Sequence, residues 1–162
     1  MVIGIIIIIP LTFTGFYEWC TFININKGYV SVDTNSKLTK WIMENTEKQD
    51  VFLTPNWAQN RFFLAGRATF YGWPYYAWSA GHDTDGRLKE YEFLLKGADL
   101  NKDKFVEICK ANNIKYIIDD PDMLTIKSEG SSEPIYNQRF IRENFELVEE
   151  IKEENTRVYK VF

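Results

Sequence analysis

Histidine, cysteine and glycine-rich phosphate motifs are scarce or missing in this chain of 162 residues. The chain has a single histidine, which disfavours a Ser/His triad and a metal site with several histidines, and no GxSxG motif is present. The two cysteines, Cys20 and Cys109, form neither a CxxC pair nor a Cys/His cluster, so we expect two unpaired thiols. Gly66, Gly72 and Gly81 lack both the dinucleotide-binding and the P-loop spacing. The sequence therefore predicts no cofactor and no bound metal.

Concentrated positive charge is missing as well. The chain has 19 Lys and Arg against 23 Asp and Glu, and the basic residues are scattered. A nucleic-acid surface needs a dense positive footprint to displace counterions from phosphates. Nucleic acid is therefore not an expected partner.

Charge is absent altogether from residues 2–17, VIGIIIIIPLTFTGFY. A signal peptide is not favoured, because a basic leader and a small-residue cleavage site are both missing. The stretch approaches the length that spans a bilayer, and Phe16, Tyr17 and Trp19 fall where an interfacial aromatic belt would lie. We therefore predict an apolar, transmembrane-like helix over residues 1–20, ahead of the folded domain.

A buried strand is the alternative for the same region. Residues 4–9 are short and rich in β-branched isoleucine, and Pro10 would end such a strand. Residues 21–34 are expected to form a tether or an edge strand, and residues 35–162 a single domain.

Helix and strand signals alternate through that domain. Their order is helix, strand, helix, strand, helix, helix, strand and a closing hairpin, which is typical of an α/β fold. We predict a small, open, mostly parallel sheet with helices on both faces and a C-terminal antiparallel hairpin. The expected features are helix caps at Asn35 or Ser36, at Asp83 or Thr84 and at Asn101, strands at 51–54, 67–72 and 114–118, a loop at 125–134, a short helix at 135–142 and a hairpin at 145–162.

Aromatic residues make up 16% of the chain and concentrate between residues 62 and 87, together with the only histidine. No helical or strand period buries all of these rings, so part of the stretch must line a surface, a cleft or an interface. Rings with polar rims suit sugar faces, lipid headgroups and protein contacts alike. The candidate ligand-binding aromatics are Trp73, Tyr75, Tyr76 and Trp78.

His82 and Asp83 lie in the most polar part of this stretch. His82 can act as a general base oriented by Asp83, or both can join Asp85 around a divalent cation. Capping of a helix by Asp83 is the commoner role for such a residue. Arg87 follows and can clamp a phosphate or carboxylate, or pair with an acid to stabilise the fold.

Strand ends supply the remaining candidates. Arg67 opens a predicted strand and has the same two possible roles as Arg87. Asp119 and Asp120 end another strand, where an acidic pair can hold a cation or sugar hydroxyls or form an ordinary turn. Ligands gather beyond the carboxyl ends of strands in open α/β sheets, so Asp119 is included among the ligand-binding candidates.

Four runs of the chain resemble a known family: NSKLTKWIMENTEKQDVFLTP, AGRATFYGWPYYAWSAGHDTDGR, NNIKYIIDD and NFELVEEIKEENTRVYKVF. Together they are similar to the extracytoplasmic C-terminal domain of large polytopic membrane proteins. Those proteins resemble glycosyltransferases that use lipid-linked sugars (GT-C type), the class that includes protein mannosyltransferases. The residues that match the family's central motif are Arg67, Trp73, Tyr75, Tyr76, Trp78, His82, Asp83 and Arg87.

The resemblance implies a membrane location, with the α/β domain on the extracytoplasmic side. In such enzymes the catalytic carboxylate is expected in a loop between early membrane helices, a region that this chain does not contain. It therefore implies a non-catalytic accessory domain that packs on a transmembrane unit of the same or a partner protein and binds a glycan or a lipid-linked sugar. The residues alone leave a second interpretation open, a free-standing soluble sugar-binding module or small enzyme with a pocket at His82, Asp83 and Asp119.

Overall fold

A computed structural model describes the backbone of residues 2–26, 33–57, 60–97, 100–128 and 130–162. The side chains of residues 2–11, Asn26, Asn60 and Tyr76 lie outside the described part. The chain divides into two compact units, Met1–Val32 and Asp33–Phe162.

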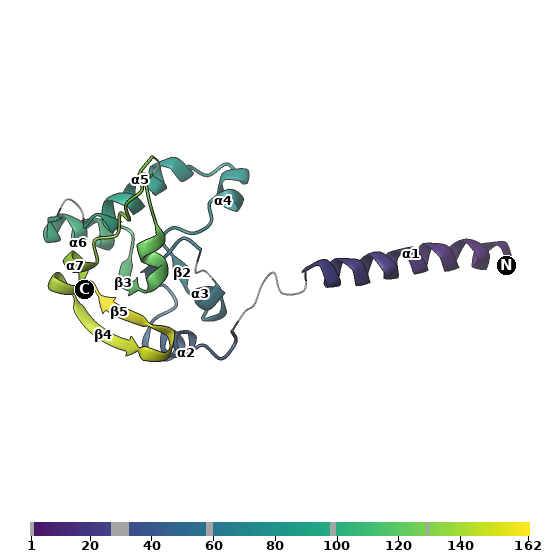
Figure 1. Cartoon of the computed structure of the whole chain (residues 1–162), viewed down its shortest axis with the longest axis horizontal. Helices are drawn as coiled ribbons and strands as arrows, with labels where there is room; N and C mark the ends of the chain where they lie inside the picture. The colour runs from purple at the N-terminus through teal and green to yellow at the C-terminus, as the bar shows by residue number, and fades with distance from the viewer. Residues whose placement is uncertain (1, 27–32, 58–59, 98–99, 129) are drawn as a thin grey trace. The chain divides into compact units, whose positions relative to one another are not determined.

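The first unit contains helix α1 (Val2–Asn26), the purple ribbon of Figure 1. A helix satisfies its backbone N–H and C=O groups within the segment, whereas a strand needs a neighbour. The strand alternative for residues 4–9 is therefore wrong. The expected tether also starts too early, because the helix continues past Thr21 to Asn26, and residues 27–32 lie outside the described part.

Large apolar side chains of α1 are exposed between Phe13 and Ile25. Among the residues whose side chains are described, no helix is both long enough and apolar enough to cross a bilayer. The transmembrane segment at residues 1–20 stays a prediction, since the side chains of its first eleven residues lie outside the described part.

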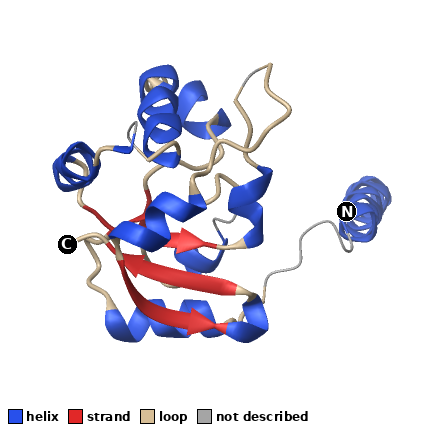
Figure 2. Ribbon diagram, turned by 60° about the vertical axis from the view of Figure 1, so that its left-hand side comes forward, coloured by secondary structure: helices blue, strands red, loops and turns tan. Residues whose placement is uncertain are grey.

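The second unit is built on a five-stranded sheet with the order β2-β1-β3-β5-β4 (Figure 2). β1 pairs in parallel with β2 and β3, whereas β5 is antiparallel to both β3 and β4. The α/β class and the closing hairpin are confirmed. The sheet is more mixed than expected, because both hairpin strands join it and β5 lies next to the central β3. The strands are β1 (Val51–Leu53), β2 (Ala68–Thr69), β3 (Ile114–Asp119), β4 (Glu146–Ile151) and β5 (Thr156–Lys160).

Helices cover both faces of this sheet, because alternate strand residues point to opposite sides. Leu53, Ile117 and Tyr159 belong to one hydrophobic cluster, with side chains from α5, α6 and α7. Phe52 and Ile118 belong to a second cluster, with side chains from α2 and α3. The sheet is thus the middle layer of three. The helices are α2 (Lys37–Asn45), α3 (Asn60–Leu64), α4 (Tyr75–Ser79), α5 (Thr84–Leu95), α6 (Lys102–Ala111) and α7 (Gln138–Asn144), with short 3-10 turns η2 (Pro121–Thr125) and η3 (Lys152–Glu154).

Helix starts follow the local signals closely. Ser36 caps α2, Asp83 caps α5 and Asn101 caps α6, each through a side-chain oxygen that accepts a backbone N–H of the first turn. β2 is shorter than the strand expected at 67–72, because its pairing with β1 ends at the bond from Phe70 N to Phe52 O.

Candidate functional site

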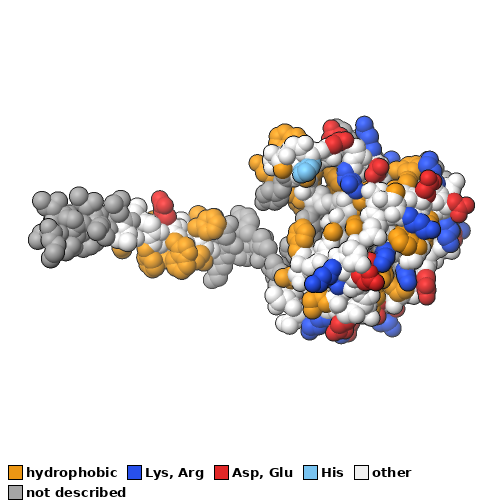
Figure 3. Space-filling model, turned by 180° about the vertical axis from the view of Figure 1, so that it is seen from behind, with side chains coloured by type: hydrophobic (Ala, Val, Ile, Leu, Met, Phe, Trp, Pro, Cys, Tyr) orange, Lys and Arg blue, Asp and Glu red, His pale blue; other side chains and the backbone are white. Residues whose placement is uncertain are grey.

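A cleft of about 680 Å³ lies beside the edge strand β2. Four of the predicted site residues line it, namely Trp73, His82, Asp83 and Arg87. The segment after β2 and the start of α5 supply these residues. In Figure 3, His82 is the pale-blue side chain at the surface, with hydrophobic side chains beside it.

Aromatic rings form one wall of the cleft. Phe70 and Tyr71 are buried, and Tyr71 stacks on Tyr91 with 4.9 Å between ring centroids. Burial raises the pKa of Tyr71, and the nearby Asp85 and Glu92 add to the increase. The Tyr71 phenol therefore keeps its proton at neutral pH and presents a neutral donor group.

Arg87 lies across this wall. Its guanidinium carbon is 4.6 Å from the centroid of the Phe70 ring, and its Nη1 donates to Asn112 Oδ1 at 3.0 Å. Asn112 in turn donates through Nδ2 to Ile108 O at 3.0 Å, which fixes its amide. Within the described residues, Nε and Nη2 of Arg87 have no protein acceptor. The side chain is thus held in place while donors remain for a ligand oxygen.

The turn between α6 and β3 adds two carboxamides, Asn112 and Asn113. Asn113 has a left-handed backbone with φ of 54°, a conformation that asparagine tolerates better than most residues. Sequence reasoning missed both residues as site candidates. The dipeptide is a turn signal, and only the fold brings it to Arg87, 25 positions earlier.

Asp83 has the capping role that was expected to be the commoner one. Its Oδ1 accepts from Asp85 N at 3.1 Å and from Gly86 N at 2.9 Å. The hydrogen bonds of this carboxylate thus go to the first turn of α5 rather than to His82. Within the described part of the chain, no three His, Cys, Asp or Glu side chains are grouped so that they could hold a metal ion.

Arg67 lies outside the cleft lining. Its Nη2 donates to Thr46 O at 2.7 Å, its Nε to Thr46 Oγ1 at 2.9 Å and its Nη1 to Ala65 O at 2.8 Å. A cation that binds the terminal carbonyl groups of a helix stabilises it. Arg67 therefore closes the C-terminus of α2, and we leave it out of the candidate site.

Asp119 is also absent from the cleft lining. It is buried at the end of β3, accepts from Gln138 Nε2 at 2.8 Å and pairs with Arg142 Nη2 at 3.1 Å. The pocket proposed for His82, Asp83 and Asp119 is therefore not formed: the cleft contains the first two residues only. Asp119 anchors α7 to the sheet instead.

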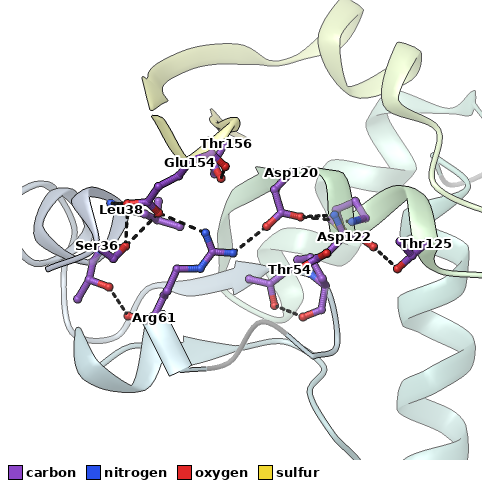
Figure 4. A network of polar contacts seen from close by, with 12 residues as sticks. Ser36, Leu38, Thr54, Arg61, Asp120, Asp122, Thr125, Glu154 and Thr156 are labelled. Carbon is purple, nitrogen blue, oxygen red and sulfur yellow. Dashed lines mark hydrogen bonds and ion pairs between the residues drawn. The ribbon is translucent and has the colours of Figure 1, made fainter. Parts of the chain in front are cut away.

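The carboxyl ends of β1 and β3 lead to a polar network rather than to the cleft (Figure 4). Arg61 Nη2 lies 2.9 Å from Asp120 Oδ2, and Arg61 Nη1 lies 3.4 Å from Glu154 Oε2. Glu154 also accepts from the backbone N of Lys37 at 2.6 Å, at the start of α2. Burial raises the pKa of Asp120, and the adjacent Arg61 opposes that increase. The network ties α2, α3, η2 and the hairpin together.

The predicted ligand-binding aromatics do not all lie in the cleft. Trp73 lines the cleft and stacks on Trp57 with 4.2 Å between centroids, a contact that the sequence did not suggest. Tyr75 and Trp78 lie on α4, exposed, with centroids 6.3 Å apart. The side chain of Tyr76 lies outside the described part. The structure thus separates a cleft from an adjoining aromatic surface.

A comparison with protein-family models gives no match for this chain, and a comparison with curated proteins gives none either.

Proposed function

We propose that this chain is a non-catalytic, extracytoplasmic accessory domain of a glycosyltransferase-like membrane protein, attached through α1 and binding a glycan in the β2 cleft. The observation that carries the proposal is the composition of the cleft. It joins an indole, Trp73, to a fixed guanidinium, Arg87, and to the two carboxamides of the α6–β3 turn.

These groups suit a sugar. A pyranose presents an apolar C–H face to an aromatic ring and a rim of hydroxyl groups to hydrogen-bonding side chains. Trp73 is partly exposed and held by its stacking on Trp57, so its ring is positioned before any ligand binds. Arg87 has donors left for hydroxyl oxygens. Asn113 lines the same cleft, and because its Nδ2 donates to Gln49 O, its Oδ1 is the atom that can accept from a sugar hydroxyl.

Attachment to a membrane is supported by the composition of α1. Residues 2–17 carry no charged side chain, and the exposed rings of Phe16, Tyr17 and Trp19 lie at the end of this stretch and just beyond it. A helix without a charged face needs an apolar environment around it, and Tyr and Trp favour the interface between lipid and water. The extracytoplasmic side and the membrane-embedded partner come from the family resemblance of the sequence.

Glycan binding is tested by NMR titration of the second unit, or of the full chain in detergent micelles, with a panel of methyl hexopyranosides. We expect chemical-shift changes at the Trp73 indole and a dissociation constant on the order of 1 mM, which is typical of a small ligand with few contacts. Arg87→Ala should weaken binding about tenfold. Arg67→Ala is the matched control, because it removes an arginine that does not line the cleft. Equal effects of the two variants, or no shift with any sugar, would contradict the glycan cleft.

Attachment is tested by fractionation of cells that express the full chain. We expect the protein to stay in the membrane pellet after an alkaline carbonate wash and to be released by detergent. Release by carbonate alone would contradict insertion of α1.

A further inference from the structure

Four exposed rings form an aromatic surface on the second unit: Trp57, Trp73, Tyr75 and Trp78. Their side chains are 67%, 45%, 56% and 64% exposed. The stacking of Trp57 on Trp73 joins the segment before α3 to the segment before α4, and Tyr75 and Trp78 continue the surface along α4. Only Trp73 is shared with the cleft.

Charge is missing from the segments that carry these rings. Residues 51–60 and 68–81 contain no Asp, Glu, Lys or Arg, although 26% of the whole chain is charged. The two arginines that border these segments are engaged elsewhere, Arg61 with Asp120 and Arg67 with Thr46. Docking this surface against an apolar phase therefore desolvates no free ion within the two segments.

We infer that this aromatic surface inserts into the headgroup region of a lipid bilayer. Indole and phenol rings have an apolar body and a polar N–H or O–H, the combination that favours the boundary between lipid and water. The surface has no charged residue and the chain has a net charge of −4, so anionic lipid headgroups do not attract it. The surface should therefore bind the interfacial region of a neutral bilayer.

The short connection to α1 also supports insertion of this surface into a bilayer. This argument rests on the proposed membrane attachment of α1. The second unit begins at Asp33, and α1 ends at Asn26. The six residues between them, 27–32, allow at most about 25 Å between Asn26 and Asp33, or seven Cα–Cα steps of extended chain. Insertion of α1 would keep the second unit tethered at the bilayer and raise its effective concentration there, so that weak insertion of single rings would suffice.

Fluorescence quenching tests the inference on the full chain. The chain is reconstituted in phosphatidylcholine vesicles that contain brominated acyl chains, which quench indoles at membrane depth. One variant keeps only Trp78 and the other keeps only Trp41, with the remaining tryptophans replaced by phenylalanine. Trp41 is the matched control, because it is half-buried on α2 and packs edge-on against Tyr116. We expect at least about twofold stronger quenching of Trp78. Equal quenching of the two indoles would overturn the inference.

Vesicle sedimentation of residues 33–162 separates this surface from α1. This unit contains every strand of the described sheet and both hydrophobic clusters, so it keeps its core without α1. We expect binding to phosphatidylcholine vesicles that is unchanged by anionic lipid and by salt. Combined Trp57→Ala, Tyr75→Ala and Trp78→Ala substitutions should weaken it about tenfold, whereas Leu124→Ala with Leu147→Ala, exposed leucines elsewhere, should not.

Each remaining outcome has one meaning. Binding that appears only with anionic lipid, or only with vesicles that contain membrane protein, would overturn the lipid-interface inference. Release of the full chain by carbonate with vesicle binding of residues 33–162 intact would contradict the proposed attachment through α1 and support the inference. Stable membrane attachment of the full chain without vesicle binding of residues 33–162 would support attachment through α1 and overturn the lipid-interface inference.

Discussion

Arg61 is the residue on which the polar network of Figure 4 depends. Its guanidinium bridges Asp120, which is buried, and Glu154, which is partly buried. Glu154 binds the start of α2, and Thr39 Oγ1 of that helix donates to the Arg61 carbonyl at 3.2 Å. One side chain therefore connects the end of β3 to the first helix of the second unit.

Replacing Arg61 by alanine should lower the free energy of unfolding by about 2–4 kcal/mol, because a buried carboxylate loses its only cationic partner among the described residues. Urea denaturation measures the change. Arg139→Ala is the control, since the Arg139–Glu143 pair is exposed on both sides and its removal should change the free energy of unfolding little. Similar losses in the two variants would show that the network adds no stability.

The destabilisation caused by Arg61→Ala should depend on pH. The pKa of Asp120 is raised in the folded state, so the folded protein binds this proton more tightly than the unfolded chain. Stability from this group therefore increases as pH falls from the raised folded pKa toward the ordinary value. Without Arg61 the folded pKa rises further, so the loss measured at pH 5 should be smaller than the loss at pH 7.5. In an Asp120→Asn background the loss caused by Arg61→Ala should show little of this pH dependence, and an undiminished dependence there would assign it to another group.

At the scale of the element, α5 shows how local and tertiary constraints meet in one helix. Asp83 caps its first turn, and Tyr91, Leu94 and Leu95 pack into the hydrophobic cluster beneath it. Gly97 follows its last turn with φ of 78°, in the left-handed region that glycine tolerates best. A Cβ at this position would also lie 2.8 Å from two ring carbons of Phe140.

Gly97→Ala should therefore lower the free energy of unfolding by about 2–4 kcal/mol, combining backbone strain with overlap against Phe140. Gly130→Ala is the matched control: its φ is 77°, but a Cβ there meets no described residue within 4 Å, its chain neighbours aside. We expect the control to lose only about 1–2 kcal/mol, the cost of the backbone conformation alone. Thermal or urea denaturation measures both variants, and equal losses would show that Phe140 moves aside at little cost.

At the scale of the whole molecule, the two units differ in how they bury apolar surface. The second unit encloses two hydrophobic clusters, one on each face of its sheet. α1 instead exposes large apolar side chains such as Phe13, Phe22 and Ile25. The stability of the second unit should thus be its own, whereas α1 needs a partner surface.

Residues 33–162 alone should unfold in one cooperative transition, with a midpoint close to that of the same unit in the full chain when both are measured in the same detergent. Circular dichroism and intrinsic fluorescence should give coincident curves. A midpoint lowered by more than about 5 °C would show that α1 contributes to the folded unit.

Much of the fold follows from the sequence, because the signals involved are local. The caps at Ser36, Asp83 and Asn101, the apolar strand at β1 and the closing hairpin depend on neighbours a few positions apart. Part of the cleft follows for the same reason, since Trp73, His82, Asp83 and Arg87 come from one continuous stretch. For residues 4–9 the sequence left a helix and a strand open and favoured the helix, because β-branched runs occur in strands and in apolar helices alike; the structure has the helix.

What the sequence determined by itself is the α/β class, the helix caps at Ser36, Asp83 and Asn101, the closing hairpin, and which stretch carries the aromatic and polar candidates. The tertiary structure alone decided which of those candidates share a site. In the folded chain, Asn112 binds Arg87 and Trp57 stacks on Trp73. Arg67 and Asp119 instead make contacts that hold helices in place, Arg67 with Thr46 and Asp119 with Arg142. The physical reason is that a long polar side chain forms hydrogen bonds with whichever carbonyl or carboxylate groups lie within about 3 Å once the helices and strands have packed. These partners are distant in the sequence, so they cannot be identified from the residue's neighbours along the chain.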